Sequence, residues 1–356
     1  MPGASEVDLA DSFVKQGFAL LDQERVEDAQ RAFEAAIAVR ADCAEGHYGL
    51  SWCLLAKGEF ERGWVEHEWR IKCKALAPEK RFDRPRWDGS DLRGKTILIY
   101  QEQGLGDTIQ HVRYAPMLAE RGARVILGCD RPLAALLSRS PGVHAIAPSQ
   151  HQIPPFDVHV SLHSLPLMFG TTLATIPARV PYVFPDPAAV KRWEARAGKR
   201  GDVLRVGLRW SGNPKHPYNA VRSMDPALLA MLAKIPRVQF YSLQKDLTIE
   251  QSRRLPAELN LIDWALEFRD WNDSAAALMQ LDLVITTDTS IPHLAGALGL
   301  KTWTLLAFHS DWRWMVGPEN SPWYPTMRLL RQPRAGDWGS VLQPVARELR
   351  ALAEGT

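Results

Sequence analysis

Four short stretches of the sequence place glycines, hydroxyls, acids and cations directly after apolar runs that resemble strands. They are QEQGLGDTIQ (101–110), WSGNPKHPYNAVRS (210–223), YSLQK (241–245) and TTDTSIPHLAGALG (286–299). Ligands of open parallel sheets bind outside the carboxyl ends of the strands, so these stretches are candidates for a binding or catalytic site. Amides, hydroxyls and cations suit a phosphorylated ligand, and an acid among them suits proton transfer.

The first stretch contains Gly104, Gly106 and Asp107, with Asp107 at the start of a predicted helix. Glycines let the backbone approach a ligand closely and adopt unusual φ angles. One interpretation of Asp107 is a helix cap that accepts hydrogen bonds from the first turn. The other is a general base that faces an acceptor hydroxyl. The third glycine of the dinucleotide fingerprint is missing, so the motif alone decides neither.

The last stretch predicts a helix that begins at Thr289 or Ser290 and ends at Gly299, with Pro292 in its first turn. Free amides and the helix dipole favour negative charge at such a start, which therefore suits an anion. The same dipole should disfavour protonation of His293. An ordinary Ser/Thr cap without a ligand is the alternative interpretation.

Basic and donor groups gather in the two middle stretches. Lys215, His216 and Arg222 follow one predicted strand, and Lys245 follows the next. They form either a solvated basic loop or a phosphate clamp, and together with the helix start they favour a diphosphate pocket. The candidate donor-binding residues are Gly104, Gly106, Ser211, Gly212, Asn213, Lys215, Arg222, Gln244, Lys245, Asp288, Thr289, Ser290 and His293.

The sequence has no DxD, HExxH, EF-hand or P-loop motif. No metal or other cofactor is therefore expected, because a helix N-terminus and Lys or Arg side chains can stabilise a leaving diphosphate.

Short β-branched runs alternate with helical patterns from residue 96 onward. This pattern predicts an α/β fold of two Rossmann-like domains, 96–185 and 186–356, whose parallel sheets carry helices on both faces. The predicted strands are 96–100, 124–128, 143–147, 157–161, 203–210, 238–243, 259–263, 282–287 and 302–308. The predicted helices are 131–139, 188–198, 226–235, 273–281, 290–299, 338–353 and one from Asp107.

The segment before these domains repeats itself. Residues 13–37 align with 47–71 at an offset of about 34, the tetratricopeptide period, which predicts helices at about 9–22, 26–39, 43–57 and 60–73. Two repeats are fewer than a free-standing array needs, so residues 1–76 should pack on the next domain. They either bind a protein or peptide or only brace the fold. Residues 77–95 are expected to be a linker, pinned by Trp87.

Composition narrows the function classes. The 356 residues carry a formal net charge of only +2, which gives no footprint for nucleic acid. None of the four cysteines forms a CxxC pair, so they are expected to be reduced thiols. No signal peptide and no apolar run of membrane-spanning length is visible, and the cytoplasm is the expected compartment.

In this order, the motifs resemble bacterial tetratricopeptide-repeat proteins with a glycosyltransferase family 9 (heptosyltransferase-like) domain. The stretches that carry the resemblance are IYQEQGLGDTIQHVRYAPMLAERGARV, WSGNP, YSLQK, LDLVITTDTSIPHLAGALG, DWRWM and SPWYPTMRLLRQ. The resemblance implies a GT-B fold with the acceptor in the first domain and a nucleotide-sugar donor in the second. It also implies that Asp107 is the base and that Asp288, Thr289 and Ser290 hold the donor diphosphate. His293 matches the family's nearby histidine, and Lys215 is the nearest match to its phosphate-binding lysine.

These observations favour a metal-independent, inverting glycosyltransferase that moves a sugar from a nucleoside-diphosphate donor to an acceptor hydroxyl on a protein or a glycan. One alternative is a scaffold that keeps the GT-B shell without turnover. Another is a nucleotide-sugar epimerase, which would convert the donor without an acceptor.

Overall fold

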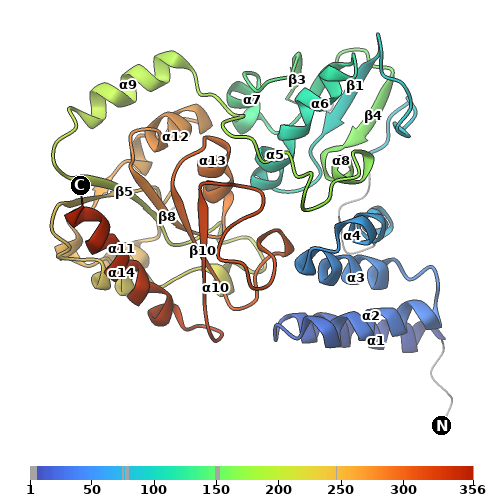
Figure 1. The fold of residues 1–356 in the computed structure, drawn as a ribbon, viewed down its shortest axis with the longest axis horizontal. Coiled ribbons are helices and arrows are strands. Elements are labelled where there is room, and N and C mark those ends of the chain that lie inside the picture. The colour runs from blue at the N-terminus through green and yellow to red at the C-terminus, as the bar shows by residue number, and fades with distance from the viewer. Residues whose placement is uncertain (1–5, 74–75, 77–79, 149–152, 246, 356) are drawn as a thin grey trace.

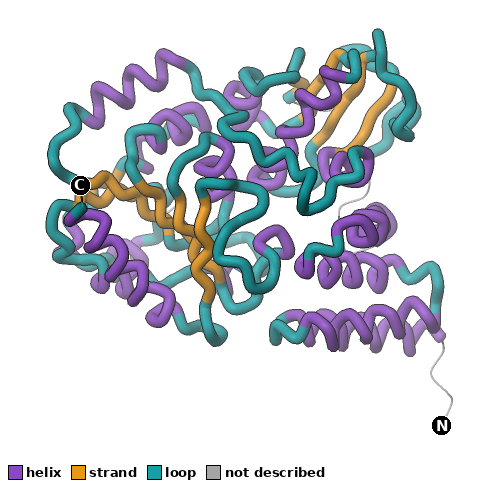
Figure 2. Tube along the Cα trace, viewed as in Figure 1, coloured by secondary structure: helices purple, strands orange, loops and turns teal. Residues whose placement is uncertain are grey.

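The computed structural model describes residues 6–73, 76, 80–148, 153–245 and 247–355. The chain forms an N-terminal helical part and two α/β domains (Figure 1). The tube view separates the strands into two sheets, with the helical part beside both domains (Figure 2). None of the helices in these residues is both long and apolar enough to cross a membrane.

The helical part contains two helix–turn–helix repeats. Its elements are α1 (Glu6–Leu21), α2 (Val26–Val39), α3 (Ala44–Lys57), α4 (Phe60–His67) and the 3₁₀ helix η1 (Glu68–Lys72). Small residues let these helices approach: a Cβ at Gly17 would lie 2.5 Å from the Phe33 ring, and one at Gly49 only 2.2 Å. The predicted helix 60–73 is wrong beyond residue 67, where the chain tightens and its side chains form ion pairs with the first α/β domain.

The first α/β domain has a four-stranded parallel sheet of order β3-β2-β1-β4. Its strands are β1 (Thr96–Tyr100), β2 (Arg124–Gly128), β3 (Ala145–Ala147) and β4 (Val158–Ser161). Its helices are α5 (Leu105–His111), η2 (Val112–Tyr114), α6 (Ala115–Glu120), α7 (Arg131–Leu137), η3 (Leu162–Ser164) and α8 (Leu165–Met168). The helix predicted from Asp107 starts two residues earlier.

The prediction that helices cover both faces is wrong for this sheet. Ile97 and Ile99 of β1 belong to a hydrophobic cluster that includes the helices of the domain. Leu98, on the opposite face, packs in a small cluster with Phe82 and Phe156, which belong to non-helical segments. The expected linker also extends the sheet, because Trp87 N donates to the His159 carbonyl of β4 at 2.8 Å.

The second domain has a six-stranded parallel sheet of order β10-β9-β8-β5-β6-β7. Its strands are β5 (Leu204–Arg209), β6 (Val238–Ser242), β7 (Ile262–Asp263), β8 (Leu283–Thr287), β9 (Thr302–Leu306) and β10 (Met327–Arg331). Its α-helices are α9 (Pro187–Ala197), α10 (Asn219–Arg222), α11 (Ile249–Arg253), α12 (Trp271–Leu278), α13 (Ser290–Ala297) and α14 (Trp338–Glu354). Short 3₁₀ turns are η4 (Pro226–Met231), η5 (Ala257–Leu259), η6 (Ala265–Glu267) and η7 (Trp312–Trp314). Counted from β5, this is the doubly wound order of dinucleotide-binding folds.

Three elements of this domain differ from the prediction. The helix expected over 226–235 is only the 3₁₀ turn η4, and Lys234 beyond it has a left-handed φ of 65°. The strand expected over 259–263 shrinks to β7, because Asn260 has a φ of 47°. Strand β10 was not predicted.

The hydrophobic core joins all three parts of the chain. Phe60 and Trp64 of α4 belong to the cluster that holds both α/β domains together. The Trp64 indole donates to the Thr171 carbonyl at 2.8 Å, and its ring meets Trp312 of the second domain at 5.3 Å. The repeats therefore pack on both domains and not only on the next one. The domain boundaries given above stay predictions.

Candidate functional site

Asp107 does not cap its helix. Helix α5 begins at Leu105 after Gly104, with no side-chain cap, and Asp107 is its third residue. The Asp107 carboxylate is instead ion-paired with Arg313 of the second domain and lies 3.6 Å from Nε2 of His163. The capping interpretation is therefore wrong, and the carboxylate lies where the two domains meet.

Arg313 is the central cation of this interface. Besides Asp107, its guanidinium binds the Asp311 carboxylate at 2.7 Å and the side-chain oxygen of Gln110 at 2.7 Å. The residue is only 6% exposed, and its charge lies 4.4 Å from the Trp312 ring. No role was predicted for Arg313, although an arginine between two tryptophans after a predicted strand, in DWRWM, was the available signal.

The electrostatics keep Asp107 ionised. Burial would raise the pKa of this carboxyl, but Arg313 and His163 outweigh it and hold the pKa well below its usual range. A carboxylate stabilised in this way is a weak base as long as Arg313 stays in place.

The glycine loop and helix α13 are in direct contact. A Cβ at Gly106 would lie 2.7 Å from the His293 ring and 3.4 Å from Cα of Ser290. The missing side chain of Gly106 thus lets α5 approach the start of α13. His293 also bonds the Tyr324 hydroxyl through Nδ1 at 2.9 Å. Burial, with a further contribution from Arg313, lowers the pKa of His293 to about 3. The ring is therefore neutral, as expected, although burial and not the helix dipole is the first cause.

The start of α13 has the predicted local geometry. The Thr289 hydroxyl caps the helix by accepting from Ile291 N at 3.2 Å, and Gly299 follows the helix with a φ of 75°. Asp288 precedes the cap. Desolvation raises the pKa of Asp288 to about 6, with Asp311 adding to the shift and Arg222 opposing it. This carboxyl therefore titrates near neutral pH.

Not all of the predicted basic residues lie near Asp288 and the start of α13. Arg222 does: a Cβ at Gly212 would lie 2.8 Å from the Arg222 guanidinium, and its charge acts on Asp288. Lys215 is exposed. The Lys245 ammonium donates to the Phe268 carbonyl at 3.3 Å.

The remaining predicted residues lie at the ends of β5 and β6. Ser211 N donates to the Gln244 side chain at 3.0 Å, and the Asn213 side chain accepts from Lys215 N at 3.0 Å. They shape the turn that carries Arg222.

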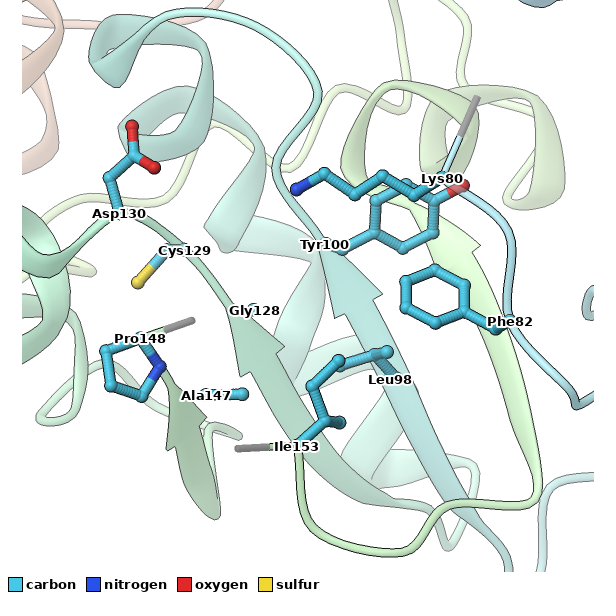
Figure 3. A pocket seen from close by; sticks show the side chains of 10 residues that line it. All are labelled: Lys80, Phe82, Leu98, Tyr100, Gly128, Cys129, Asp130, Ala147, Pro148 and Ile153. Atoms are coloured by element: carbon cyan, nitrogen blue, oxygen red, sulfur yellow. The ribbon is translucent and has the colours of Figure 1, made fainter. Parts of the chain in front are cut away.

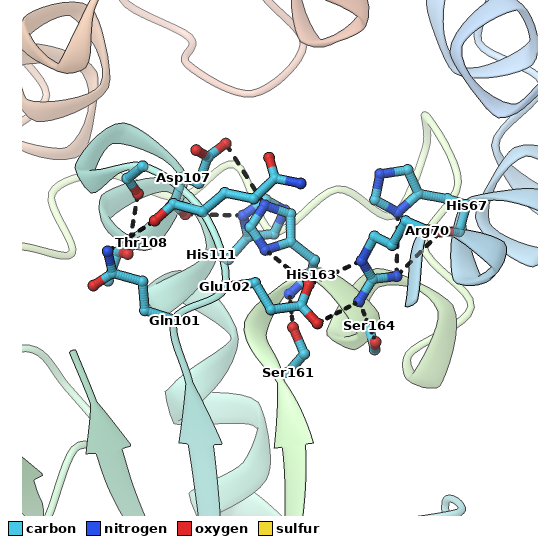
Figure 4. A network of polar contacts seen from close by, with 12 residues as sticks. His67, Arg70, Gln101, Glu102, Asp107, Thr108, His111, Ser161, His163 and Ser164 are labelled. Atoms are coloured by element: carbon cyan, nitrogen blue, oxygen red, sulfur yellow. Dashed lines mark hydrogen bonds and ion pairs between the residues drawn. The ribbon is translucent and has the colours of Figure 1, made fainter. Parts of the chain in front are cut away.

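A buried polar network connects the repeats to this interface (Figure 4). Arg70 of η1 forms an ion pair with Glu102, two residues before Gly104. Three histidines, His67, His111 and His163, come together beside it, with the His111 and His163 rings 4.8 Å apart. Burial, aided by neighbouring cations, lowers the pKa of His67 and His111 well below the usual range. This network was not predicted from the sequence.

A separate cavity of about 120 Å³ lies on the loop-covered side of the first sheet (Figure 3). Its walls include Lys80, Phe82, Tyr100 and Asp130, and none of the predicted site residues lines it. It is smaller than the ~300 Å³ of a typical ligand pocket.

Within the described ranges, no group of three or more His, Cys, Asp or Glu side chains is placed to hold a metal ion. The four cysteines are buried and unpaired, as expected.

Comparison with known proteins supports both halves of the architecture. Residues 9–63 match the family model of the tetratricopeptide repeat. The chain is 30% identical to Protein FlbA of Caulobacter vibrioides over an alignment of 373 residues, which covers 97% of this chain and 62% of FlbA. The chain thus spans less than two thirds of that relative.

Two solved structures share the α/β architecture. One is a glycosyltransferase family 9 protein of Veillonella parvula, with a TM-score of 0.53 and 11% identity over 75% of this chain and 98% of that one. The α/β part has the fold of that family. The E. coli ADP-heptose lps heptosyltransferase II agrees, with a TM-score of 0.50 and 14% identity over 73% of this chain and 99% of that one. The predicted GT-B fold with N-terminal repeats is confirmed.

Proposed function

We propose that the protein is a metal-independent, inverting glycosyltransferase that uses a nucleoside-diphosphate sugar. The observation that carries the proposal is the position of Asp107, which lies on the first domain directly opposite the capped start of α13 on the second. In open α/β sheets this edge is where ligands bind, and two such edges meet here.

The second domain would hold the donor. The amides at the start of α13 and the hydroxyls of Thr289 and Ser290 suit a diphosphate, since the helix dipole favours negative charge there. Arg222 and Arg313 lie close enough to Asp288 to influence its titration and can supply positive charge to the same anion. The exposed Lys215 is free to close on it when the donor binds.

Donor binding would also activate the base. A diphosphate carries more negative charge than a carboxylate, so it competes with Asp107 for Arg313. Once Arg313 turns to the phosphate, the pKa of Asp107 rises and the carboxylate can accept a proton. Asp107 then takes the proton of the acceptor hydroxyl while that oxygen bonds the anomeric carbon. The bond from this carbon to the diphosphate breaks, and the nucleoside diphosphate leaves with its electron pair.

The acceptor would lie on the first domain, and the repeats would recruit a protein or glycan acceptor to it. Tetratricopeptide repeats bind proteins through their helical faces, and these repeats contact the domain that carries Asp107. Action in the cytoplasm on a nucleotide sugar fits this proposal.

A scaffold without turnover is the second candidate. It is favoured by the close contact of Gly106 with Ser290 and His293 and by the Asp107–Arg313 pair, which both lie at the interface. If this arrangement is permanent, no donor can enter.

A thermal-shift screen separates the two candidates. The purified protein is tested with UDP, ADP, GDP, CMP and dTDP, with and without EDTA, because ligand binding raises the apparent stability. A transferase should be stabilised by one nucleotide irrespective of EDTA and should release that nucleotide from its sugar donor. No shift with any nucleotide would contradict the transferase and favour the scaffold.

A further inference from the structure

The last turn of the repeat segment reaches the loop that carries Asp107. Arg70 of η1 is buried, with its side chain 2% exposed. Its Nε donates to Glu102 at 2.9 Å and its Nη2 to the other oxygen of the same carboxylate at 3.3 Å. Nη1 also donates to Glu68 at 2.5 Å and to the His67 carbonyl at 3.2 Å, and Nη2 donates to the Ser164 hydroxyl at 2.8 Å. The guanidinium thus ties the repeats to the glycine loop on one side and to η3 on the other.

His163 lies between Glu102 and Asp107. Nδ1 of His163 lies 3.7 Å from the Glu102 carboxylate, and Nε2 lies 3.6 Å from the Asp107 carboxylate. The imidazole is 3% exposed and stands between the two acids (Figure 4). Both distances exceed a hydrogen bond by a few tenths of an ångström. A displacement of a few tenths of an ångström would therefore bring either carboxylate into hydrogen-bond range of the ring.

We propose that Arg70 is a positioning residue for the transfer reaction, acting through Glu102 and His163 on Asp107. The repeat segment would then complete the catalytic site as well as recruit an acceptor. This inference rests on the proposed function. The two-pronged contact is essential to it, because a planar guanidinium fixes a carboxylate in orientation, whereas an ammonium supplies only a point charge.

The test compares Arg70→Lys with Arg62→Gln, the matched control. Arg62 lies on α4 and is half-exposed, and its ion pair with Glu34 stays within the repeats. Glu102→Gln is the second variant, in case Arg70→Lys does not fold, because it leaves Arg70 paired with Glu68. The probes are UDP-glucose, UDP-N-acetylglucosamine, ADP-glucose and GDP-mannose, with water as acceptor.

Three quantities are measured for each protein. The first is the rate at which nucleoside diphosphate is released, divided by the concentration of nucleotide-binding sites. The others are the affinity for the free nucleotide and the hydrogen exchange of residues 101–111. Arg70→Lys and Glu102→Gln should release diphosphate roughly 10–100-fold more slowly, the cost of a misplaced catalytic group. Their nucleotide affinity should be unchanged and exchange of the loop faster, while Arg62→Gln should behave as wild type.

If Arg70→Lys releases nucleoside diphosphate at the wild-type rate per binding site, the inference is overturned, since charge alone would then suffice. A parallel loss of nucleotide affinity would also overturn it, because that indicates general structural damage. If the wild-type protein releases no nucleoside diphosphate from any donor, the proposed function fails. The role of Arg70 in the transfer reaction fails with it. Loop exchange then decides whether Arg70 positions residues 101–111: faster exchange supports that contact, and unchanged exchange refutes it.

Discussion

Arg313 of the second α/β domain is ion-paired with Asp107 of the first. The pair lies beside the contact between α5 and α13, where Gly106 packs on His293. This guanidinium therefore adds an ion pair to the hydrophobic contact between the domains and occupies the carboxylate proposed as the base. In the proposed mechanism, an exchange of Arg313 from Asp107 to the donor phosphate would link donor binding to catalysis.

Replacing Asp107 by Asn should slow turnover roughly 10²–10⁴-fold, because the acceptor loses its general base. The amide can still bond Arg313, so the fold and nucleotide binding should remain. Steady-state release of nucleoside diphosphate and a nucleotide thermal shift check both parts. Nearly wild-type turnover would remove Asp107 from the mechanism.

Replacing Arg313 by Met should lower the free energy of unfolding by about 3–5 kcal/mol, because Asp107 and Asp311 lose their buried partner. Urea unfolding measures the loss. The control is Arg196→Gln, which breaks an exposed pair with Glu267 and should cost no more than about 1 kcal/mol. Equal effects of the two changes would mean that the Arg313 network contributes little to stability.

Acidification should destabilise the protein below about pH 6.5. The pKa of His293 is about 3 in the folded chain, and the pKa values of His67 and His111 are also lowered. The unfolded chain thus binds these protons first, and stability is lost as the pH falls. His293 alone should account for about 2 kcal/mol between pH 7 and pH 5.

Asp288 opposes this trend. Its pKa of about 6 means that the folded chain binds a proton before the unfolded one, so it gains stability as the pH falls. Unfolding free energies at pH 7 and pH 5, for the wild type and His293→Gln, test the balance. The variant should lose less on acidification, and an identical loss would contradict the assignment.

Adding a methyl group at Gly106 should separate α5 from α13. The new Cβ would meet the His293 ring at 2.7 Å, so Gly106→Ala should destabilise the protein by about 1–3 kcal/mol. Gly201→Ala is the control, since nothing lies within 4 Å of its Cβ position. Melting temperatures compare the two variants, and a wild-type value for Gly106→Ala would show that the interface yields without cost.

Local patterns predicted most strands and helices, because period and composition act within a few residues. Strand β1 and helix α2 have the predicted bounds. The failures depend on distant contacts. The helix predicted over 60–73 ends at His67, shortly before Arg70 binds Glu102. Asp107 pairs with Arg313, 206 positions away in the chain, and does not cap its own helix.

Residues of the candidate site that directly follow strands could be predicted from the sequence. Residues whose position depends on contacts with distant side chains could not. Asp107 and the start of α13 were placed by their position after strands. His163 carries no motif of its own, and DWRWM does not show that Arg313 pairs with Asp107, because these contacts form only when distant segments meet in the fold. One clue did exist: His67 aligns with Phe33 of the first repeat, and a polar ring at a core position indicates a polar neighbourhood.

The aromatic side chains of α4 contact both α/β domains, and this affects how the chain can be divided. Cutting between the repeats and residue 96 would strip Trp64 from Trp312 and Thr171 and leave indole surfaces of both fragments in water. We therefore expect neither fragment to be as stable alone as it is in the full chain. To transfer these repeats to another enzyme, the residues that contact Trp64, such as Trp312 and Thr171, would have to be transferred with them.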